Sequence, residues 1–241
     1  MIINYHDGEK VELQFAEAYH SYMVGKEIVP SVTQACGIIS KPALVPWALK
    51  EGVEWLAKNL TKTAGIDFLS NGVKTAYKST STDAINIGTI THEWVEKAIQ
   101  FHLGEGEEPK MPKQKEAQTA IKAFQAWLQE NEVEWLAVEQ KLYHRDYGYA
   151  GTADAVATIN GEHAVIDWKT SKRIYPEYHL QVAAYAKAVE DMTGMPVDAT
   201  YILRCDKKTG KFQSVRSEDV EENFLAFRCA LHLHRKMKEL R

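Results

Sequence analysis

Two acids and a lysine lie next to two short apolar segments of the chain, and side chains of these types together could catalyse a reaction. Residues 164–172 have the sequence AVIDWKTSK, so three apolar residues lead directly into Asp167, with Lys169 two positions further on. Charged side chains are rarely buried unless another group compensates their charge. Because side chains alternate along a strand, Asp167 and Lys169 share one face and Trp168 points to the other. The pattern indicates a functional strand end.

The preceding strand supplies a further acid to the same face. Asn160–Gly161 is the strongest short sequence signal for a two-residue hairpin turn of type I′. Counting outward from that turn places Asp154 opposite Asp167 and Thr152 opposite Lys169. The sequence therefore predicts a hairpin that brings two carboxylates together beside a lysine.

Two facing carboxylates need a compensating partner. Opposed side chains on one face have Cβ atoms about 4.5–5.5 Å apart, and two charges at that distance repel by roughly 3 kcal/mol at an effective dielectric of about 20. Either a cation lies between the acids or one of them is protonated. A hard divalent cation such as Mg²⁺ or Mn²⁺ fits best, with Lys169 orienting a water molecule for phosphodiester hydrolysis. The alternative is a solvated Asp–Lys pair at a strand end.

The elements that must position this hairpin follow from the residue pattern. The first thirty residues alternate like β-structure with a turn at Gly25, and helical spacing extends from Ser31 to about Leu103 and again over residues 116–131. Strands are predicted at 133–144, 149–159, 162–170, 198–205 and 211–217, with a connection around residues 206–210 between the last two. Helices are predicted at 176–194 and from an N-cap near Ser217.

This element order predicts an α/β (α+β) fold in which a central mixed sheet is flanked by helices. We expect one domain over residues 1–241. Residues 1–131 would form an N-terminal hairpin and a helical wall, and residues 132–241 would form the catalytic sheet and its helices. Trp94, Trp127 and Trp135 are expected to pack in the core.

Composition narrows the functional class. The chain has 241 residues, is 45% hydrophobic and 26% charged, and carries a net charge of −4, which argues against a passive DNA-coating protein. No apolar run is long enough for a membrane span and no secretion signal is seen, and the three scattered cysteines make a reducing, cytoplasmic setting the default expectation. Cys36, Cys205 and Cys229 are widely spaced without a CxxC pair, so neither disulfides nor a zinc or iron–sulfur site is expected.

Four sequence elements together carry a resemblance to a known family. The segment GTAD, which ends at Asp154, is followed after twelve residues by DWK, which begins at Asp167, and this arrangement resembles the PD-(D/E)xK nuclease superfamily. GTITHEWVE matches the GTxxHxxxE pattern of the RecB-like exonuclease branch, and QVAAY matches its QxxxY pattern. The segments VPSVTQ and YHSYMVGKEI are similar to the N-terminal region of phage recombination exonucleases and of the mitochondrial genome-maintenance exonuclease. The proline of the family name is Ala153 here.

The resemblance implies a restriction-endonuclease-like core and specific roles for individual residues. The implied catalytic residues are Asp154, Asp167 and Lys169, and the implied metal ligands are His92, Asp154, Asp167 and the backbone carbonyl of Trp168. Implied substrate contacts are Gln181, Tyr185, Thr152 and Lys172, with Glu96 and Glu139 as accessory acids. Without the motifs, His92 would be a packed or surface residue, Tyr185 a core residue and Glu139 a solvent-facing strand residue.

The implied function is a Mg²⁺- or Mn²⁺-dependent DNA exonuclease of recombination or repair, without an iron–sulfur cluster. Its partners would be a DNA single strand or duplex end and a phage single-strand annealing protein, in a bacterial or phage-infected cell. Two alternatives remain open: a structure-specific endonuclease on the same fold, and a catalytically silent nucleic-acid-binding module. The facing acids and lysine argue against the silent module, which has no need for them.

Overall fold

The computed structural model describes residues 1–16, 21–206 and 211–240, with the side chains of residues 79–86 left aside. Tyr19 and His20 of the expected N-terminal hairpin lie outside this part of the chain, as do residues 207–210 of the predicted connection between the last two strands. The chain divides into two compact units, one made of Met1–Ile39 with Thr91–Arg241 and the other of Ser40–Ile90. The single-domain assignment over residues 1–241 stays a prediction.

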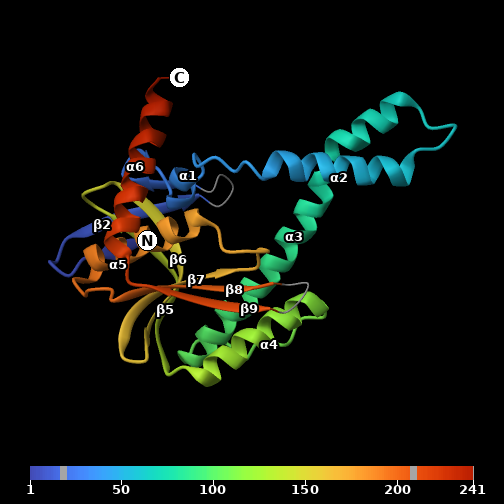
Figure 1. The fold of residues 1–241 in the computed structure, drawn as a ribbon. Helices are drawn as coiled ribbons and strands as arrows, with labels where there is room; N and C mark the ends of the chain where they lie inside the picture. The colour runs from blue at the N-terminus through green and yellow to red at the C-terminus, as the bar shows by residue number, and fades with distance from the viewer. Residues whose placement is uncertain (17–20, 207–210, 241) are drawn as a thin grey trace. The chain divides into compact units, whose positions relative to one another are not determined.

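A five-stranded mixed sheet forms the centre of the first unit (Figure 1). Its spatial order is β5-β6-β7-β8-β9, and only β7 and β8 run parallel. A parallel pair needs a crossover connection, which helix α5 (Pro176–Thr193) supplies. The strands are β5 (Val133–His144), β6 (Tyr149–Ile159), β7 (Glu162–Lys169), β8 (Ala199–Cys205) and β9 (Phe212–Ser217). The predicted mixed sheet flanked by helices is confirmed.

The turn between β6 and β7 is the one that the sequence predicts. Asn160 and Gly161 have φ values of 51° and 87°, the left-handed conformation that a type I′ turn requires at both central positions. Ile159 pairs with Glu162, and the ladder continues in that register along the strands. The Asn160 side chain also accepts the backbone N–H of Glu132 at 2.9 Å, which ties the turn to the start of β5.

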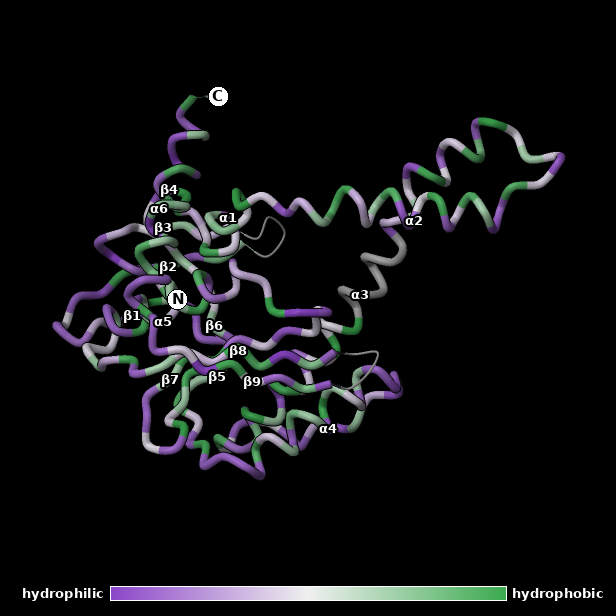
Figure 2. The backbone as a smooth tube through the Cα atoms, viewed as in Figure 1, coloured by the Kyte–Doolittle hydropathy of each residue, from purple (hydrophilic) through white to green (hydrophobic). Residues whose placement is uncertain are grey.

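Each face of the sheet packs against its own helices. On one face lie α4 (Lys115–Glu130) and the C-terminal part of α3 (Ile66–His102), where Phe124, Trp127 and Trp135 form the core with Trp94 partly buried at its edge. On the other face lie α5, α6 (Val220–Glu239) and α1 (Val32–Cys36). The tube in Figure 2 shows hydrophobic segments along the strands of the five-stranded sheet. Burial of both faces explains why the apolar runs of β6 to β8 are nearly continuous.

The last helix begins later than the sequence suggests. Ser217 was expected to cap it, but Ser217 is the last residue of β9 and α6 starts at Val220 with Asp219 in the N-cap position. The Ser217 hydroxyl instead accepts the backbone N–H of Asp219 at 3.2 Å. A serine that forms this local turn is engaged before the helix begins, so the predicted cap is wrong by two residues.

The N-terminal residues form a separate four-stranded antiparallel sheet in the same unit. Its strands are β1 (Ile2–Asn4), β2 (Lys10–Ala16), β3 (Ser21–Val24) and β4 (Glu27–Val29). The turn predicted at Gly25 is present, with a φ of 60°. After β4, Ser31 caps α1 through a capping box with Gln34, which confirms the predicted helix start.

The second unit contains α2 (Leu44–Asn59) and the part of α3 up to Ile90. Trp55 contacts Phe68 with ring centroids 5.4 Å apart, and Trp47 contacts Tyr77 at 6.2 Å. The hydropathy of α2 alternates along the helix (Figure 2), and Leu49 is among the large apolar residues that stay exposed. Among the described residues, no helix combines the length and apolar character needed to cross a lipid bilayer.

Candidate active site

Asp154, Asp167 and Lys169 meet at the open end of the β6–β7 hairpin. Asp167 is completely buried, and its Oδ2 lies 2.5 Å from the Nζ of Lys169. The carboxylate of Asp154 accepts the backbone N–H of Trp168 at 2.6 Å. Two acids that are thirteen positions apart in the sequence are thus held within one small region by the turn between them.

The β6–β7 ladder ends one residue before the acids. Its last described pair joins Ala155 to Ile166, so the expected pairing of Asp154 with Asp167, and of Thr152 with Lys169, is not part of the ladder. The physical reason is that the Asp154 side chain takes up the Trp168 N–H in place of a backbone carbonyl. The predicted register is right up to this point, and the backbone ladder does not extend to the two pairs beyond it.

Trp168 anchors the strand from the opposite face. Its indole ring is buried and meets Phe124 edge-on with centroids 5.7 Å apart, and it lies 6.2 Å from the ring of Trp135. Such aromatic contacts add about 0.5–1.5 kcal/mol to the effect of burial. Because side chains alternate, fixing the indole on one face fixes Asp167 and Lys169 on the other, as the sequence predicts.

The electrostatics of the pair reflect its burial. Burial raises the pKa of Asp167, the Lys169 ammonium opposes this rise and the charge of Asp154 adds to it, so that the pKa is about 6. Burial alone would lower the pKa of Lys169, but the carboxylates of Asp167 and Asp154 hold it above its usual value. Lys169 therefore stays a cation, and a charge on the buried Asp167 carboxylate is costly.

His92 reaches the same place from α3. Its Nδ1 lies 3.9 Å from the Oδ2 of Asp154, and the imidazole is about one-third exposed. The structure therefore brings this motif histidine to the acids, although seventy-four residues separate it from Asp167 and nothing local could position it. Whether His92 binds a metal stays a prediction.

Gln181 and Tyr185 lie on the face of α5 that covers the site. The Gln181 amide donates to the Oδ1 of Asp167 at 3.2 Å and to the Tyr185 hydroxyl at 3.0 Å. Tyr185 is buried at 3% exposure, so the core alternative describes its ring and the expected DNA-facing position does not. The residue supports Gln181, which in turn orients Asp167.

Glu139 and Glu96 add negative charge near Asp154. Glu139 is half-buried on β5 and has a φ of 47°, the left-handed conformation that is uncommon outside glycine. Burial, followed by the charges of Asp154 and Glu96, raises the pKa of Glu139 to about 7. Glu96 accepts the side-chain amide of Gln100 at 3.1 Å. Glu139 is therefore only partly exposed, at a point of β5 where the backbone departs from strand geometry.

The two other predicted substrate contacts differ in exposure. Thr152 is half-buried, and its hydroxyl lies 2.7 Å from that of Tyr22 on β3. Lys172 has an exposed side chain in the segment that follows β7, and its carbonyl accepts the guanidinium of Arg204 at 2.8 Å. A contact of either side chain with DNA stays a prediction.

Sequence reasoning missed Tyr22, Tyr178 and Arg204. The Tyr178 ring lies 5.0 Å from the Lys169 ammonium, and Arg204 pairs with Lys169 across the β7–β8 ladder. Tyr178 could have been found, because it stands three positions before Gln181 and so shares its helix face. Tyr22 and Arg204 come from distant segments without any local signal.

The donor set at the hairpin end suits a hard divalent cation. The Oδ2 of Asp167 is buried without an aligned hydrogen-bond donor, and carboxylate and carbonyl oxygens are the ligands that suit Mg²⁺ and Mn²⁺. Among the described residues, however, no three His, Cys, Asp or Glu side chains converge closely enough to form a ready-made metal site. Lys169 pairs with Asp167 and the Trp168 amide with Asp154, so both acids are already engaged.

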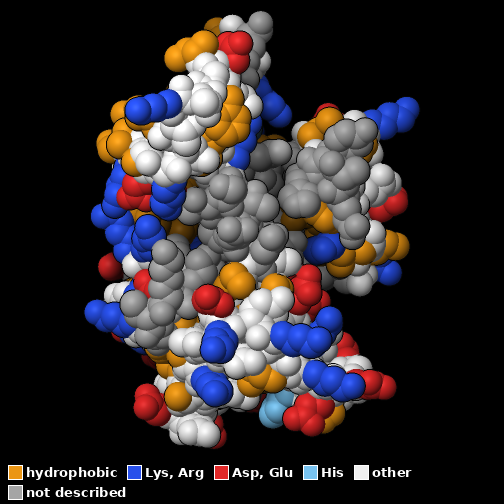
Figure 3. Space-filling model, turned by 90° about the vertical axis from the view of Figure 1, so that its right-hand side faces the viewer, with side chains coloured by type: hydrophobic (Ala, Val, Ile, Leu, Met, Phe, Trp, Pro, Cys, Tyr) orange, Lys and Arg blue, Asp and Glu red, His pale blue; other side chains and the backbone are white. Residues whose placement is uncertain are grey.

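Charges of both signs are mixed on the surface that Figure 3 shows. Figure 3 shows Lys and Arg side chains interspersed with Asp and Glu on one face of the molecule. This distribution agrees with the net charge of −4 and contrasts with the broad basic field of proteins that coat nucleic acid.

Comparison with known proteins gives a family and weak structural likenesses. A family model described as "PD-(D/E)XK nuclease superfamily" matches residues 75–241, and no curated protein matches the sequence. The structure titled "Crystal structure of SSO0001" is 13% identical with a TM-score of 0.39, over 81% of this chain and 86% of that one. An alkaline exonuclease (LHK-Exo) from Laribacter hongkongensis is 15% identical with a TM-score of 0.30, over 81% and 100%. LHK-Exo in complex with dAMP is 15% identical with a TM-score of 0.32, over 80% and 97%.

Structural similarities at these TM-scores are too weak to assign an activity. The family model, in contrast, matches more than half of the chain. The matched residues include the whole five-stranded sheet and every predicted site residue. The sheet and its flanking helices form the restriction-endonuclease-like core that the sequence motifs imply. The chain belongs to the PD-(D/E)XK nuclease superfamily.

Proposed function

We propose that the protein is a metal-dependent DNA exonuclease of the RecB-like branch. The observation that carries the proposal is the ion pair of Lys169 with the fully buried Asp167, beside Asp154. A structural protein gains little from a buried acid whose pKa is raised to about 6, because replacing such a pair by apolar residues is often neutral or stabilising. The GTxxHxxxE and QxxxY motifs favour the exonuclease branch.

Asp154, Asp167 and His92 would hold a divalent cation, with the Trp168 carbonyl as a further ligand. When bound, such a cation polarises a phosphodiester and lowers the pKa of a bound water. Gln181 holds one oxygen of Asp167 in place, and the packed indole of Trp168 fixes the strand that bears both acid and lysine. Lys169 remains protonated at Nζ and offsets the negative charge that develops on the phosphate.

The natural substrate of this site is a DNA single strand or duplex end, in recombination or repair in a bacterial or phage-infected cell. Residues 1–131 would supply the N-terminal hairpin and a helical wall beside the DNA path, and residues 132–241 the catalytic sheet, as parts of one nuclease domain. An annealing protein as partner has no support among the described residues.

The test uses 5′- and 3′-labelled single- and double-stranded oligonucleotides together with circular single-stranded DNA. We expect Mg²⁺- or Mn²⁺-dependent release of short products from linear DNA, none in EDTA, and resistance of the circle. Asp167→Asn and Lys169→Ala should each lower the rate at least about 100-fold. Cleavage of the circle would favour the endonuclease alternative. Equal rates for the parent and both variants would show that the activity does not come from this site.

A further inference from the structure

A row of cationic and aromatic side chains leads from Lys169 into the segment before α5. The Lys169 ammonium lies 5.0 Å from the centre of the Tyr178 ring. The Tyr178 ring meets that of Tyr175 edge-on, with centroids 5.5 Å apart and an angle of 83° between the planes. The guanidinium of Arg173 lies over the Tyr175 ring at 4.9 Å. The row connects the catalytic lysine to exposed side chains.

Arg204 fixes the segment that carries this row. Arg204 is buried at 3% exposure on β8, and its Nη1 donates to the carbonyls of Ser171 and Lys172 at 2.9 and 2.8 Å. Burying a guanidinium is expensive unless its donors are used. Because the Arg204 guanidinium binds two successive carbonyls, the chain directly after β7 has a defined path to the start of α5.

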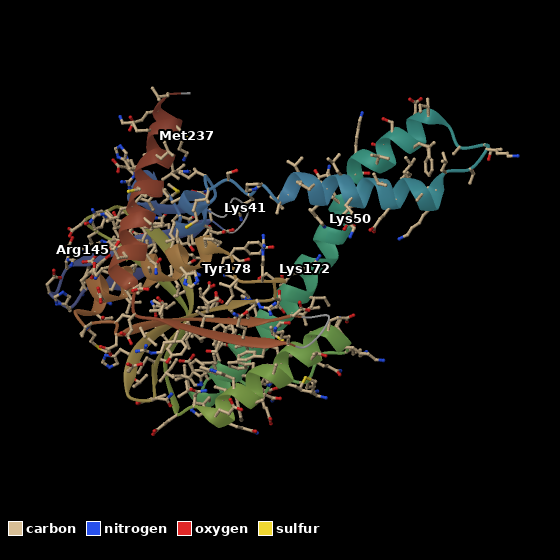
Figure 4. The ribbon with its side chains drawn as sticks, in the orientation of Figure 1. Lys41, Lys50, Arg145, Lys172, Tyr178 and Met237 are labelled. Carbon is tan, nitrogen blue, oxygen red and sulfur yellow. The ribbon has the colours of Figure 1, made fainter. Side chains whose placement is uncertain are left out.

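The two tyrosine rings have free polar ends. Tyr175 and Tyr178 are half-buried, and neither hydroxyl has a hydrogen-bond partner among the described residues. Tyr178 lies on α5, and the neighbouring Lys172 and Arg173 have exposed side chains; Figure 4 labels Tyr178 and Lys172. Buried tyrosines usually pair their hydroxyls, as Tyr149 does with the Ala184 carbonyl at 2.8 Å. The two rings at the site are therefore available to a ligand.

We propose that Tyr175 and Tyr178 form a stacking platform in which a nucleobase of the nucleotide next to the scissile phosphate stacks on the face of one ring, while the other ring supports the first edge-on. Aromatic faces bind bases of single strands with little sequence preference, and adjacent cations attract the flanking phosphates. Lys172 and Arg173 supply those cations at the exposed end of the row, and Lys169 stands at the catalytic end. This proposal rests on the proposed function and names how the same site holds the strand.

The contrasting explanation is that both tyrosines only stabilise the start of α5. Pro176 begins that helix and the Tyr178 N–H donates to the Tyr175 carbonyl at 3.0 Å, so the rings do lie at a helix end. A structural role would change binding of every substrate equally. A platform instead depends on whether a base is present at one position of the DNA, and this difference can be measured.

The experiment compares Tyr175→Ala, Tyr178→Ala and Tyr178→Phe with the parent on single-stranded oligonucleotides. One series carries 2-aminopurine at successive positions from the end and is titrated in EDTA, where stacking quenches the fluorescence. A second series carries an abasic site at the same positions and is used for KM and kcat with Mg²⁺. Tyr147→Leu is the matched control, because it removes a cation–aromatic contact with Arg228 (5.1 Å from the ring centre) in the turn that precedes β6, outside the row of Lys169, Tyr178, Tyr175 and Arg173.

We expect quenching at one position in the parent and its loss in both alanine variants. On normal DNA the alanine variants should raise KM roughly 5- to 150-fold, the range that base stacking on an aromatic ring predicts. Tyr178→Phe keeps the ring and should retain the quenching, and Tyr147→Leu should behave as the parent. With the base removed at the quenched position, the KM values of the parent and the alanine variants should converge.

Equal KM penalties on normal and abasic DNA at every position would overturn the platform. If the parent cleaves DNA but no 2-aminopurine position responds to Tyr175→Ala or Tyr178→Ala, the platform is wrong and the proposed function is unaffected. If the quenching and its loss are seen without metal-dependent cleavage of any DNA, the platform is supported and the nuclease assignment fails. The two proposals can therefore fail separately.

Discussion

Replacing Gly151 by alanine should disturb the site through a defined chain of contacts. An added Cβ at Gly151 would lie 2.6 Å from Cε1 and 3.2 Å from Cδ1 of Tyr185, and 3.3 Å from Cγ2 of Val32. Carbon atoms pack at about 3.5–4.0 Å, so the ring must move by about 1 Å. Tyr185 is buried at 3% exposure, so its ring cannot simply turn out into solvent. Overpacking of this kind costs about 1–3 kcal/mol of unfolding free energy.

The same displacement should reach the catalytic acid. Tyr185 accepts the amide of Gln181 at 3.0 Å, and that amide also binds Asp167 at 3.2 Å, so a shift of about 1 Å breaks or reorients both hydrogen bonds. We expect Gly151→Ala to lower kcat on the order of 10- to 100-fold, as small misplacements of catalytic groups do. Urea unfolding followed by circular dichroism and initial rates with Mg²⁺ measure the two effects.

A double-mutant cycle tests the chain of contacts. Tyr185→Leu removes the ring, so Gly151→Ala should cost much less stability in that background, with a coupling of about 1–2 kcal/mol. Gly65→Ala is the matched control, because no heavy atom lies within 4 Å of the Cβ it would add, and its effect should stay within about 0.5 kcal/mol. An equal cost of Gly151→Ala with and without the Tyr185 ring would refute the reasoning.

Three further predictions concern Glu139, Arg145 and Asn160. Glu139 has a pKa of about 7 in the folded protein, compared with about 4.3 for an unperturbed glutamate. Because the folded state binds this proton more tightly than the unfolded state, the stabilisation from Glu139 is fully present below about pH 4.3 and is lost as pH rises through 7. The urea midpoint in EDTA should fall across that window, and less so in Glu139→Gln; parallel curves would contradict this. Arg145 binds the carboxylates of Asp7 in the turn between β1 and β2 and of Asp191 in α5, so Arg145→Met should lower the thermal midpoint, with a smaller difference from the parent in high salt. Asn160→Ala should cost about 1–2 kcal/mol in urea unfolding, whereas Asn160→Gly, which keeps the turn conformation, should cost less.

The parts of the site that could be predicted are those fixed by local chemistry. Asn160–Gly161 sets the register of the hairpin, and alternation along β7 then places Asp167 and Lys169 together, with Trp168 opposite. Each step needs only a turn preference and the two-residue period of a strand. The mixed sheet followed from strand order because β7 and β8 are joined by a helix.

The parts that could not be predicted depend on contacts between distant segments. The residues near Asp154 in the sequence do not indicate that its carboxylate accepts the Trp168 N–H at the point where the ladder ends. Glu139 lies on an apparently regular strand, yet its positive φ and burial come from its neighbours in space. Tyr185 fits its motif equally well as a DNA contact or a core residue, and only the packing against Gly151 decides.

The turn at Asn160–Gly161 also has a consequence for how the protein folds. The hairpin is a unit of low contact order, and such hairpins close in about 1–10 μs, before distant segments meet. The β7–β8 pair must wait for the α5 crossover, so the acids Asp154 and Asp167 come together while solvent still reaches them. Their repulsion then slows hairpin closure as well as destabilising the finished site. Stopped-flow refolding should accordingly be faster in Asp154→Asn than in the parent at neutral pH, with the two rates converging in acid; equal rates at neutral pH would mean that the hairpin closes after the folding barrier.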